Sequence, residues 1–155
     1  MIAIVVAAGT AEAGIGTPPA PSQSTSETDT RAFVGLNWTF GQGRSSAEGV
    51  LGLARVKSDS DGDARGAKLS LHLPIEGGLT FGAVKLTGMT GQTDAMGEAG
   101  VGFGRDGVFG TAGLWLPYVN FGLDVGLDGG LRGYAGFQTL EEWDRPREQA
   151  APTPF

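Results

Sequence analysis

The chain of 155 residues contains no cysteine, so neither a disulfide framework nor a thiolate metal site holds its fold. It also has no apolar run near the roughly 18 residues that a membrane-spanning helix needs. If it crosses a bilayer, it must do so as a closed barrel, because only that arrangement also satisfies every backbone group in lipid. Basic residues are few and dispersed, with 11 Lys and Arg against 17 Asp and Glu. The basic stripe that binds a phosphate backbone is missing, and we expect no nucleic-acid partner.

Glycine is the abundant residue. The sequence has 28 glycines, most of them in its middle part, and their spacing is irregular. Each glycine inside a helix costs about 1 kcal/mol relative to alanine, whereas in strands glycine marks bends, bulges and close approaches of the backbone. The composition therefore favours an all-β protein.

The two ends of the chain differ from its centre. Residues 1–13 are apolar and then small, like the end of a secretory signal peptide, although no Lys or Arg precedes Arg31. A buried first strand is the alternative interpretation. Residues 14–31 are rich in Pro, Ser and Thr and predict a flexible spacer. Residues 141–155 predict a polar, proline-containing tail, which leaves 32–140 as the folded part.

Alternation of apolar and polar residues with a period of two predicts strands in the central region. It is clearest from Tyr118 to Leu127. The other clear segments are Ala32–Gly41, Ala67–Leu73 and Ala99–Phe103, and the weaker ones are Gly49–Lys57, Leu79–Gly88, Gly107–Leu116 and Leu131–Leu140. Short, glycine-containing connections require antiparallel neighbours. We therefore predict an up-and-down antiparallel meander of about eight strands, closed into a barrel so that no edge is exposed.

The faces opposite the apolar stripes carry glycine and charges of both signs, which suits a narrow lumen filled by side chains better than a wet surface. The apolar faces would then contact lipid. Some of the glycines would leave room in the lumen for Tyr134 or Trp115. The predicted polar network of the lumen consists of Arg55, Lys68, His72, Glu98, Asp124 and Arg132. The predicted aromatic residues at the membrane interface are Trp38, Phe40, Trp115 and Tyr118.

The segments AFVGLNWTFG, VNFGLDVGLDGG and GYAGF belong to a region, Ala32 to Leu140, that resembles the small eight-stranded outer-membrane β-barrels of Gram-negative bacteria. The resemblance implies export to the outer membrane, with membrane lipid and the barrel-assembly machinery as partners, and a monomer. Two features depart from that family. The terminal Phe155 follows Pro154 in a tail without alternation, and every connection is short, so a large adhesive surface is not expected.

Ser70 and His72 lie two residues apart on one predicted strand face, with Glu76 and Glu98 near in sequence. A serine, a histidine and a carboxylate are the components of an acyl hydrolase, and some small outer-membrane barrels deacylate lipid A with such a group. Residues two apart on a strand are about 6 to 7 Å apart at their roots, which is long for proton transfer. This pair also belongs to the predicted lumen face, so we favour a polar lumen network.

Three functions follow from these patterns. The first is a non-enzymatic outer-membrane barrel with a structural or surface-interaction role and a lumen filled by side chains. The second is a soluble exported barrel, periplasmic or secreted, that binds a small apolar ligand inside. The third is an outer-membrane lipid A acyl hydrolase. We predict no catalytic residues, no metal site and no cofactor.

Overall fold

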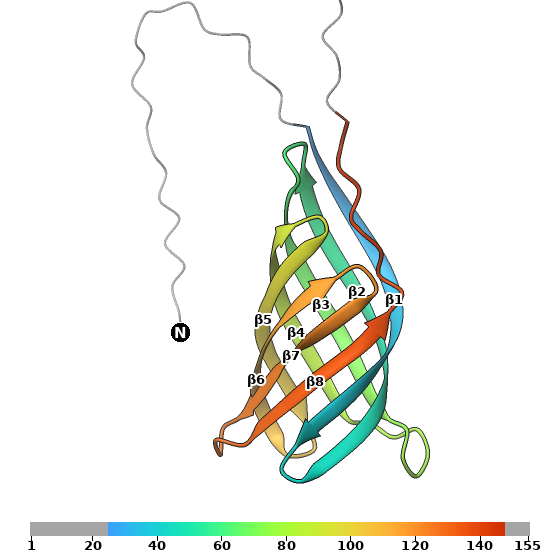
Figure 1. Cartoon of the computed structure of the whole chain (residues 1–155), viewed down its shortest axis with the longest axis vertical. Helices are drawn as coiled ribbons and strands as arrows, with labels where there is room; N and C mark the ends of the chain where they lie inside the picture. The colour runs from blue at the N-terminus through green and yellow to red at the C-terminus, as the bar shows by residue number, and fades with distance from the viewer. Residues whose placement is uncertain (1–24, 148–155) are drawn as a thin grey trace, which may run out of the picture.

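The computed structural model of the protein describes residues 25–147, which form eight antiparallel strands in sequence order, closed into a barrel (Figure 1). The predicted fold class is confirmed. The strands are β1 (Ser26–Gly41), β2 (Arg44–Asp59), β3 (Asp63–Pro74), β4 (Ala83–Gln92), β5 (Ala95–Gly104), β6 (Gly107–Leu116), β7 (Val119–Gly126) and β8 (Leu131–Gln138). Residues 25–147 contain no helix long and apolar enough to span a membrane. The segment 1–13, predicted to resemble a signal peptide, lies outside the described residues.

The barrel has two distinct ends, which we name by what they carry. The hairpin end, at the bottom of Figure 1, carries the β1–β2, β3–β4, β5–β6 and β7–β8 connections. The terminal end carries the other three connections and both ends of the described chain. Tight turns at both ends use glycines with positive φ, such as Gly62 (91°) and Gly129 (82°), each directly after an aspartate. Aspartate–glycine pairs suit such turns, because glycine adopts positive φ without steric cost.

Strands β1 and β2 are longer than the sequence predicts. They have 16 residues each, and they pair along their whole length from Ser26 with Asp59 to Gly41 with Arg44. The predicted spacer 14–31 is therefore corrected, since its last residues belong to β1, while 14–24 lie outside the described residues. The polar sequence of residues 26–31 gives no alternation to recognise. Strand β2 nevertheless supplies the backbone hydrogen bonds that make this part of β1 a strand.

The predicted tail is also corrected, because its first part is packed against the barrel. Residues 139–147, which we call the C-terminal strap, cross the terminal end. The backbone N–H of Trp143 donates to the carbonyl of Thr93 at 3.1 Å, and the Trp143 ring lies 6.2 Å from that of Trp115. Trp143 is only 2 % exposed. A large apolar side chain in a polar segment thus covers the end of the barrel interior; residues 148–155 lie outside the described residues.

The outer surface is apolar on every strand, and we call it the apolar wall. Outward-facing side chains that are 47–62 % exposed, one from each strand in order, are Val34, Leu53, Leu69, Leu86, Val101, Leu114, Leu123 and Phe137. The interior has the opposite character over half its length, where most of the buried side chains are polar or charged. This is the reverse of a soluble protein, which buries its apolar side chains and exposes its polar ones.

The interior changes character along the barrel axis. Towards the terminal end it is filled by an apolar stopper, which consists of Ala54, Val56, Ala64, Met89, Met96 and Trp115 together with Leu140 and Trp143 of the C-terminal strap. Towards the hairpin end it is polar. The stopper explains why the predicted lumen position of Arg55 is wrong. Ala54 and Val56 fill the interior, so Arg55 between them points outward and is exposed.

Candidate functional site: the polar chamber of the lumen

The polar half of the interior, which we call the polar chamber, contains three hydrogen-bonded groups. Strand β3 supplies one side of it, because Lys68, Ser70 and His72 alternate with the outward-facing residues of that strand. All three are buried. The remaining members come from β2, β4, β5, β7 and β8, so the chamber joins most of the strands of the barrel.

The first group centres on Glu98 of β5. The ammonium of Lys68 donates to one of its carboxylate oxygens, and the hydroxyl of Tyr134 donates to the other at 3.2 Å. Tyr134 fits in the lumen because Gly113 and Gly122 face it as partners on β6 and β7. A Cβ atom at either glycine would lie only 2.6 or 2.5 Å from the tyrosine oxygen. The glycines predicted to leave room for Tyr134 or Trp115 therefore include Gly113 and Gly122, and the side chain that they accommodate is that of Tyr134.

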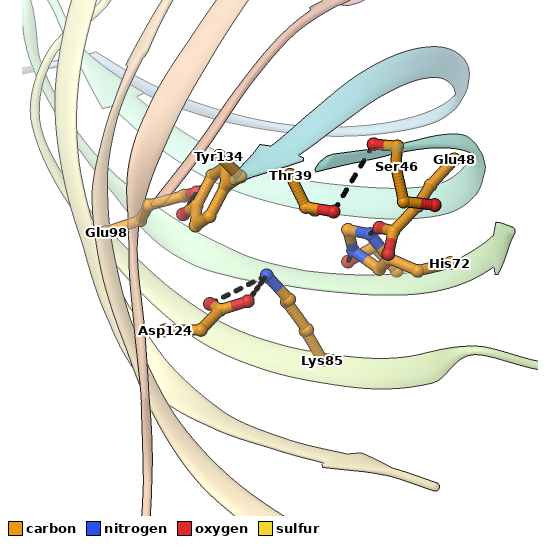
Figure 2. A network of polar contacts seen from close by, with 9 residues as sticks. Thr39, Ser46, Glu48, His72, Lys85, Glu98, Asp124 and Tyr134 are labelled. Atoms are coloured by element: carbon orange, nitrogen blue, oxygen red, sulfur yellow. Dashed lines mark hydrogen bonds and ion pairs between the residues drawn. The ribbon is translucent and has the colours of Figure 1, made fainter. Parts of the chain in front are cut away.

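The second group is an ion pair between Lys85 of β4 and Asp124 of β7, visible at the centre of Figure 2. The ammonium of Lys85 lies 2.8 Å from each carboxylate oxygen of Asp124. It also lies 4.1 Å from the centre of the Tyr134 ring, within the range of a cation–π interaction. Through Tyr134 this pair contacts the first group, so the charges of these two groups form one continuous network.

The third group is a chain of three side chains from Ser70 to Glu48. The hydroxyl of Ser70 lies 3.1 Å from Nε2 of His72, and Nδ1 of His72 lies 3.1 Å from a carboxylate oxygen of Glu48 on β2. Figure 2 shows the Glu48 carboxylate beside the His72 ring. The imidazole bridges the distance that separates the roots of residues 70 and 72. This is the connectivity of a serine–histidine–acid triad.

The carboxylate that contacts His72 belongs to Glu48, and not to Glu76 or Glu98, the two acids that lie near Ser70 and His72 in the sequence. Glu98 is occupied by Lys68 and Tyr134, and Glu76 is exposed in the β3–β4 turn. Glu48 is distant in sequence, and it reaches His72 because β2 pairs with β3. Glu48 can be recognised as the partner of His72 only when the register between β2 and β3 is known.

The space beside Ser70 is very small. The cavity in the chamber measures about 10 Å³, which is room for about one water molecule. The Ser70 residue is 3 % exposed. Three polar atoms that line the same cavity, Thr87 Oγ1, Asn120 Oδ1 and Gln138 Nε2, have no hydrogen-bond partner among the described residues. The cavity thus fits a single hydrogen-bonded water and not an acyl chain.

Four of the six residues predicted for the lumen network lie in the polar chamber: Lys68, His72, Glu98 and Asp124. Arg55 is on the outer surface, as described above. Arg132 is also corrected. It lies at the hairpin end with its side chain 46 % exposed, and its guanidinium is 3.9 Å from a carboxylate oxygen of Asp106. Asp124, its partner on β7, is already paired with Lys85, so the guanidinium extends to the rim instead.

The sequence prediction missed Lys85 and Glu48. Lys85 lies in β4, whose sequence has apolar residues on both faces and gives no clear inward side. Lysine inside a strand of mostly apolar and small residues was the available signal, since a buried charge needs a partner.

Three of the four predicted interface aromatics are exposed on the outer surface, namely Trp38, Phe40 and Tyr118. Trp38 packs edge-on against Phe137, with ring centres 6.4 Å apart. Tyr118 lies in the β6–β7 turn, where the nearby Glu141 carboxylate raises the pKa of its phenol. The fourth position is corrected: Trp115 points inward, is 0 % exposed and belongs to the apolar stopper.

Within residues 25–147 no cluster of three or more His, Asp or Glu side chains has a metal-binding arrangement. Comparisons of the chain with family models, with curated proteins and with solved structures find no match.

Proposed function

We propose that the protein is a non-enzymatic outer-membrane β-barrel of a Gram-negative bacterium, with a structural or surface-interaction role and a lumen that does not conduct. The apolar wall is the observation that carries this proposal. Exposed apolar side chains surround the barrel on all eight strands, while the charged side chains of Lys68, Lys85, Glu98 and Asp124 are buried inside. Such a distribution is favourable where the solvent outside the barrel is lipid, and unfavourable in water.

The dimensions of the strands support the same environment. Strands β4, β5 and β6 have 10 residues each, β1 to β3 are longer, and β7 and β8 have 8. A tilted transmembrane strand needs about 9–11 residues to cross the hydrocarbon layer. Strand β1 pairs with β8 from Gly35 to Phe40, and the N–H of Thr139 donates to the carbonyl of Val34 at 2.9 Å, so the barrel is closed at the height of these residues, as a bilayer requires.

The interior supports a role without conduction or ligand storage. The apolar stopper fills one end and the polar chamber leaves only about 10 Å³. A soluble barrel that carries an apolar ligand needs a cavity of about 300 Å³ or more with a largely apolar lining. The small cavity and its polar lining therefore argue against that alternative.

The Ser70–His72–Glu48 chain favours a lipid A hydrolase by its connectivity alone. Its position argues against that function, because Ser70 faces the lumen and not the apolar wall, where a lipid ester would lie. In our proposal the hydrogen bonds among Ser70, His72 and Glu48 stabilise the barrel and have no catalytic role. Changing Ser70 or His72 to alanine should leave the acylation of lipid A in expressing cells unchanged; a loss of deacylation in the Ser70→Ala variant would establish the hydrolase instead.

Membrane fractionation tests the main proposal. The full chain, expressed with an export signal in a Gram-negative host, should appear in the outer-membrane fraction and require detergent for extraction. Unboiled, it should migrate differently in a denaturing gel than after boiling, as closed barrels do. Recovery of the chain in the soluble periplasmic fraction without detergent would contradict the proposal.

A further inference from the structure

Three cations form a patch on the outer surface near the terminal end. Arg55 and Lys57 lie on β2 and Arg65 on β3, and all three are exposed. Lys57 and Arg65 are direct partners across the two strands, and Arg55 is the next outward-facing residue along β2. We call these three residues the cationic patch.

The cationic patch has no anionic partner in the described part of the chain. The ion pairs among residues 25–147 use other cations, namely Arg31, Lys68, His72, Lys85 and Arg132. Like charges directly opposite one another on neighbouring strands are destabilising. The repulsion between Lys57 and Arg65 therefore lowers the stability of the barrel, and an anion bound between them would remove this repulsion.

An apolar groove adjoins the cationic patch on the same strands. It measures about 370 Å³, and its outward-facing lining residues are Leu51, Leu53, Leu69, Leu71 and Val84. Leu53 is two residues from Arg55 along β2, which places the cations about 7 Å beyond the end of the groove. The outer surface thus presents an apolar trough that ends at a cluster of positive charge.

We propose that this surface binds an anionic phospholipid, with the headgroup phosphate on the cationic patch and an acyl chain along the apolar groove. This inference rests on the proposed membrane location. A phosphodiester group carries two free oxygens that accept hydrogen bonds from guanidinium forks, which Arg55 and Arg65 provide. The ammonium of Lys57 adds a point charge between them. A zwitterionic lipid brings its own cation to the patch and is bound more weakly.

Lipid binding to the purified full chain, folded in a zwitterionic detergent, tests the inference directly. Native mass spectrometry would follow titrations with phosphatidylglycerol and phosphatidylcholine. We expect phosphatidylglycerol to bind at least about tenfold more tightly, which is the effect of one charge-assisted hydrogen bond. The triple variant Arg55→Gln, Lys57→Gln, Arg65→Gln should lose this preference.

A matched control removes the same number of cations from the other end of the barrel. Arg44, Arg105 and Arg132 are exposed near the hairpin end, and their replacement by glutamine should leave the preference intact. Equal losses in both triple variants would overturn the inference, because they would show a general effect of net charge.

Two further ligands separate a phospholipid from simpler anions. Inorganic phosphate should compete only weakly with phosphatidylglycerol, since it does not use the apolar groove. A neutral diacylglycerol should bind the wild-type chain and the triple variant equally, since it has acyl chains but no anion for the cationic patch. Competition by phosphate as strong as that by phosphatidylglycerol, or loss of diacylglycerol binding in the triple variant equal to that of phosphatidylglycerol, would overturn the lipid assignment. The Val84→Trp variant fills the groove and should weaken the binding of phosphatidylglycerol while leaving the binding of inorganic phosphate unchanged.

The single variant Lys57→Gln tests the same inference through its resistance to urea, and it serves if the triple variant does not fold. Removing the like-charge pair should raise resistance to urea in phosphatidylcholine vesicles. In vesicles that contain phosphatidylglycerol, the wild-type chain should gain more resistance than the variant does. If the wild-type chain inserts in both vesicles with equal stability, this inference fails while the proposed membrane location stands. If it inserts in neither, the proposed function fails.

Discussion

Lys85 and Asp124 form an ion pair across the lumen, although their strands, β4 and β7, are not neighbours in the barrel. The ammonium contacts both carboxylate oxygens at 2.8 Å, and both side chains are buried. The pair therefore connects two parts of the wall that backbone hydrogen bonds do not join. Its two charges compensate each other beside a cavity of only about 10 Å³.

Breaking one side of this pair should be costly. Lys85→Met leaves the Asp124 carboxylate buried without its cation, and we expect a loss of about 3–5 kcal/mol in the free energy of unfolding. Asp124→Leu should cost a similar amount for the same reason. The double variant leaves no uncompensated charge and should lose much less than the sum of the two. Urea unfolding of the folded barrel in detergent measures all three. Additive losses would show that the two charges do not interact.

Alanine at Gly113 should destabilise the barrel, in part through Tyr134. The new Cβ would lie 2.6 Å from the tyrosine oxygen and 2.6 Å from the backbone carbonyl oxygen of Phe121, and we expect a loss of about 1–3 kcal/mol from this overpacking. Adding Tyr134→Phe removes the tyrosine oxygen and should recover part of the loss. Gly88→Ala is the control, because its Cβ would meet no atom closer than 3.9 Å. A similar loss in the Gly88 variant would attribute the effect to glycine in strands generally.

The C-terminal strap should protect the apolar stopper. Trp143→Ala removes the ring that packs against Trp115 and lies 4.7 Å from the guanidinium of Arg31. We expect a loss of about 3–5 kcal/mol, together with greater quenching of Trp115 fluorescence by acrylamide. The variant Trp38→Ala, on the outer surface, should change Trp115 quenching little. If Trp115 stays protected in Trp143→Ala, the strap does not seal the terminal end.

A charge on the apolar wall distinguishes a membrane barrel from a soluble one. Leu86 faces outward between Leu69 and Val101 of the adjacent strands, in the middle of the apolar wall. If the protein spans a bilayer, as we propose, Leu86→Arg should cost about 2–4 kcal/mol in vesicles. Gln92→Arg, on the same face of β4 at the terminal end, should cost less than about 1 kcal/mol. A soluble barrel would tolerate both changes equally.

The sequence predicts the eight strands because alternation and turn glycines are local signals. The strand from Val119 to Gly126 is an example, since each residue's face follows from its neighbours. The N-terminal part of β1 has no such pattern, because its hydrogen bonds to β2 make it a strand. Trp143 likewise gains its buried position from residues distant in sequence, such as Thr93 and Trp115.

The sequence predicts only some residues of the polar chamber, because several of its contacts also depend on residues distant in sequence. Alternation assigns Lys68 and His72 to the inside, because the outward-facing residues of their strand are clearly apolar. It misassigns Arg55, because the lumen is apolar at that height and the inward residues of β2 resemble a lipid-facing stripe. It does not identify Glu48 as the partner of His72, since that contact depends on the register between β2 and β3.

The order of the strands has a consequence for how the barrel forms. Seven of its eight pairings join strands that are consecutive in the chain, and only β1 with β8 joins distant segments. Hairpins can therefore assemble one after another at little entropic cost, and a single late closure completes the cylinder. Arg31 and Asp144 form an ion pair at 3.0 Å, so the beginning and end of the described chain meet at the terminal end. A circular permutant that connects them and opens at Gly77–Gly78 would keep every pairing while transferring the closing step to β3 and β4.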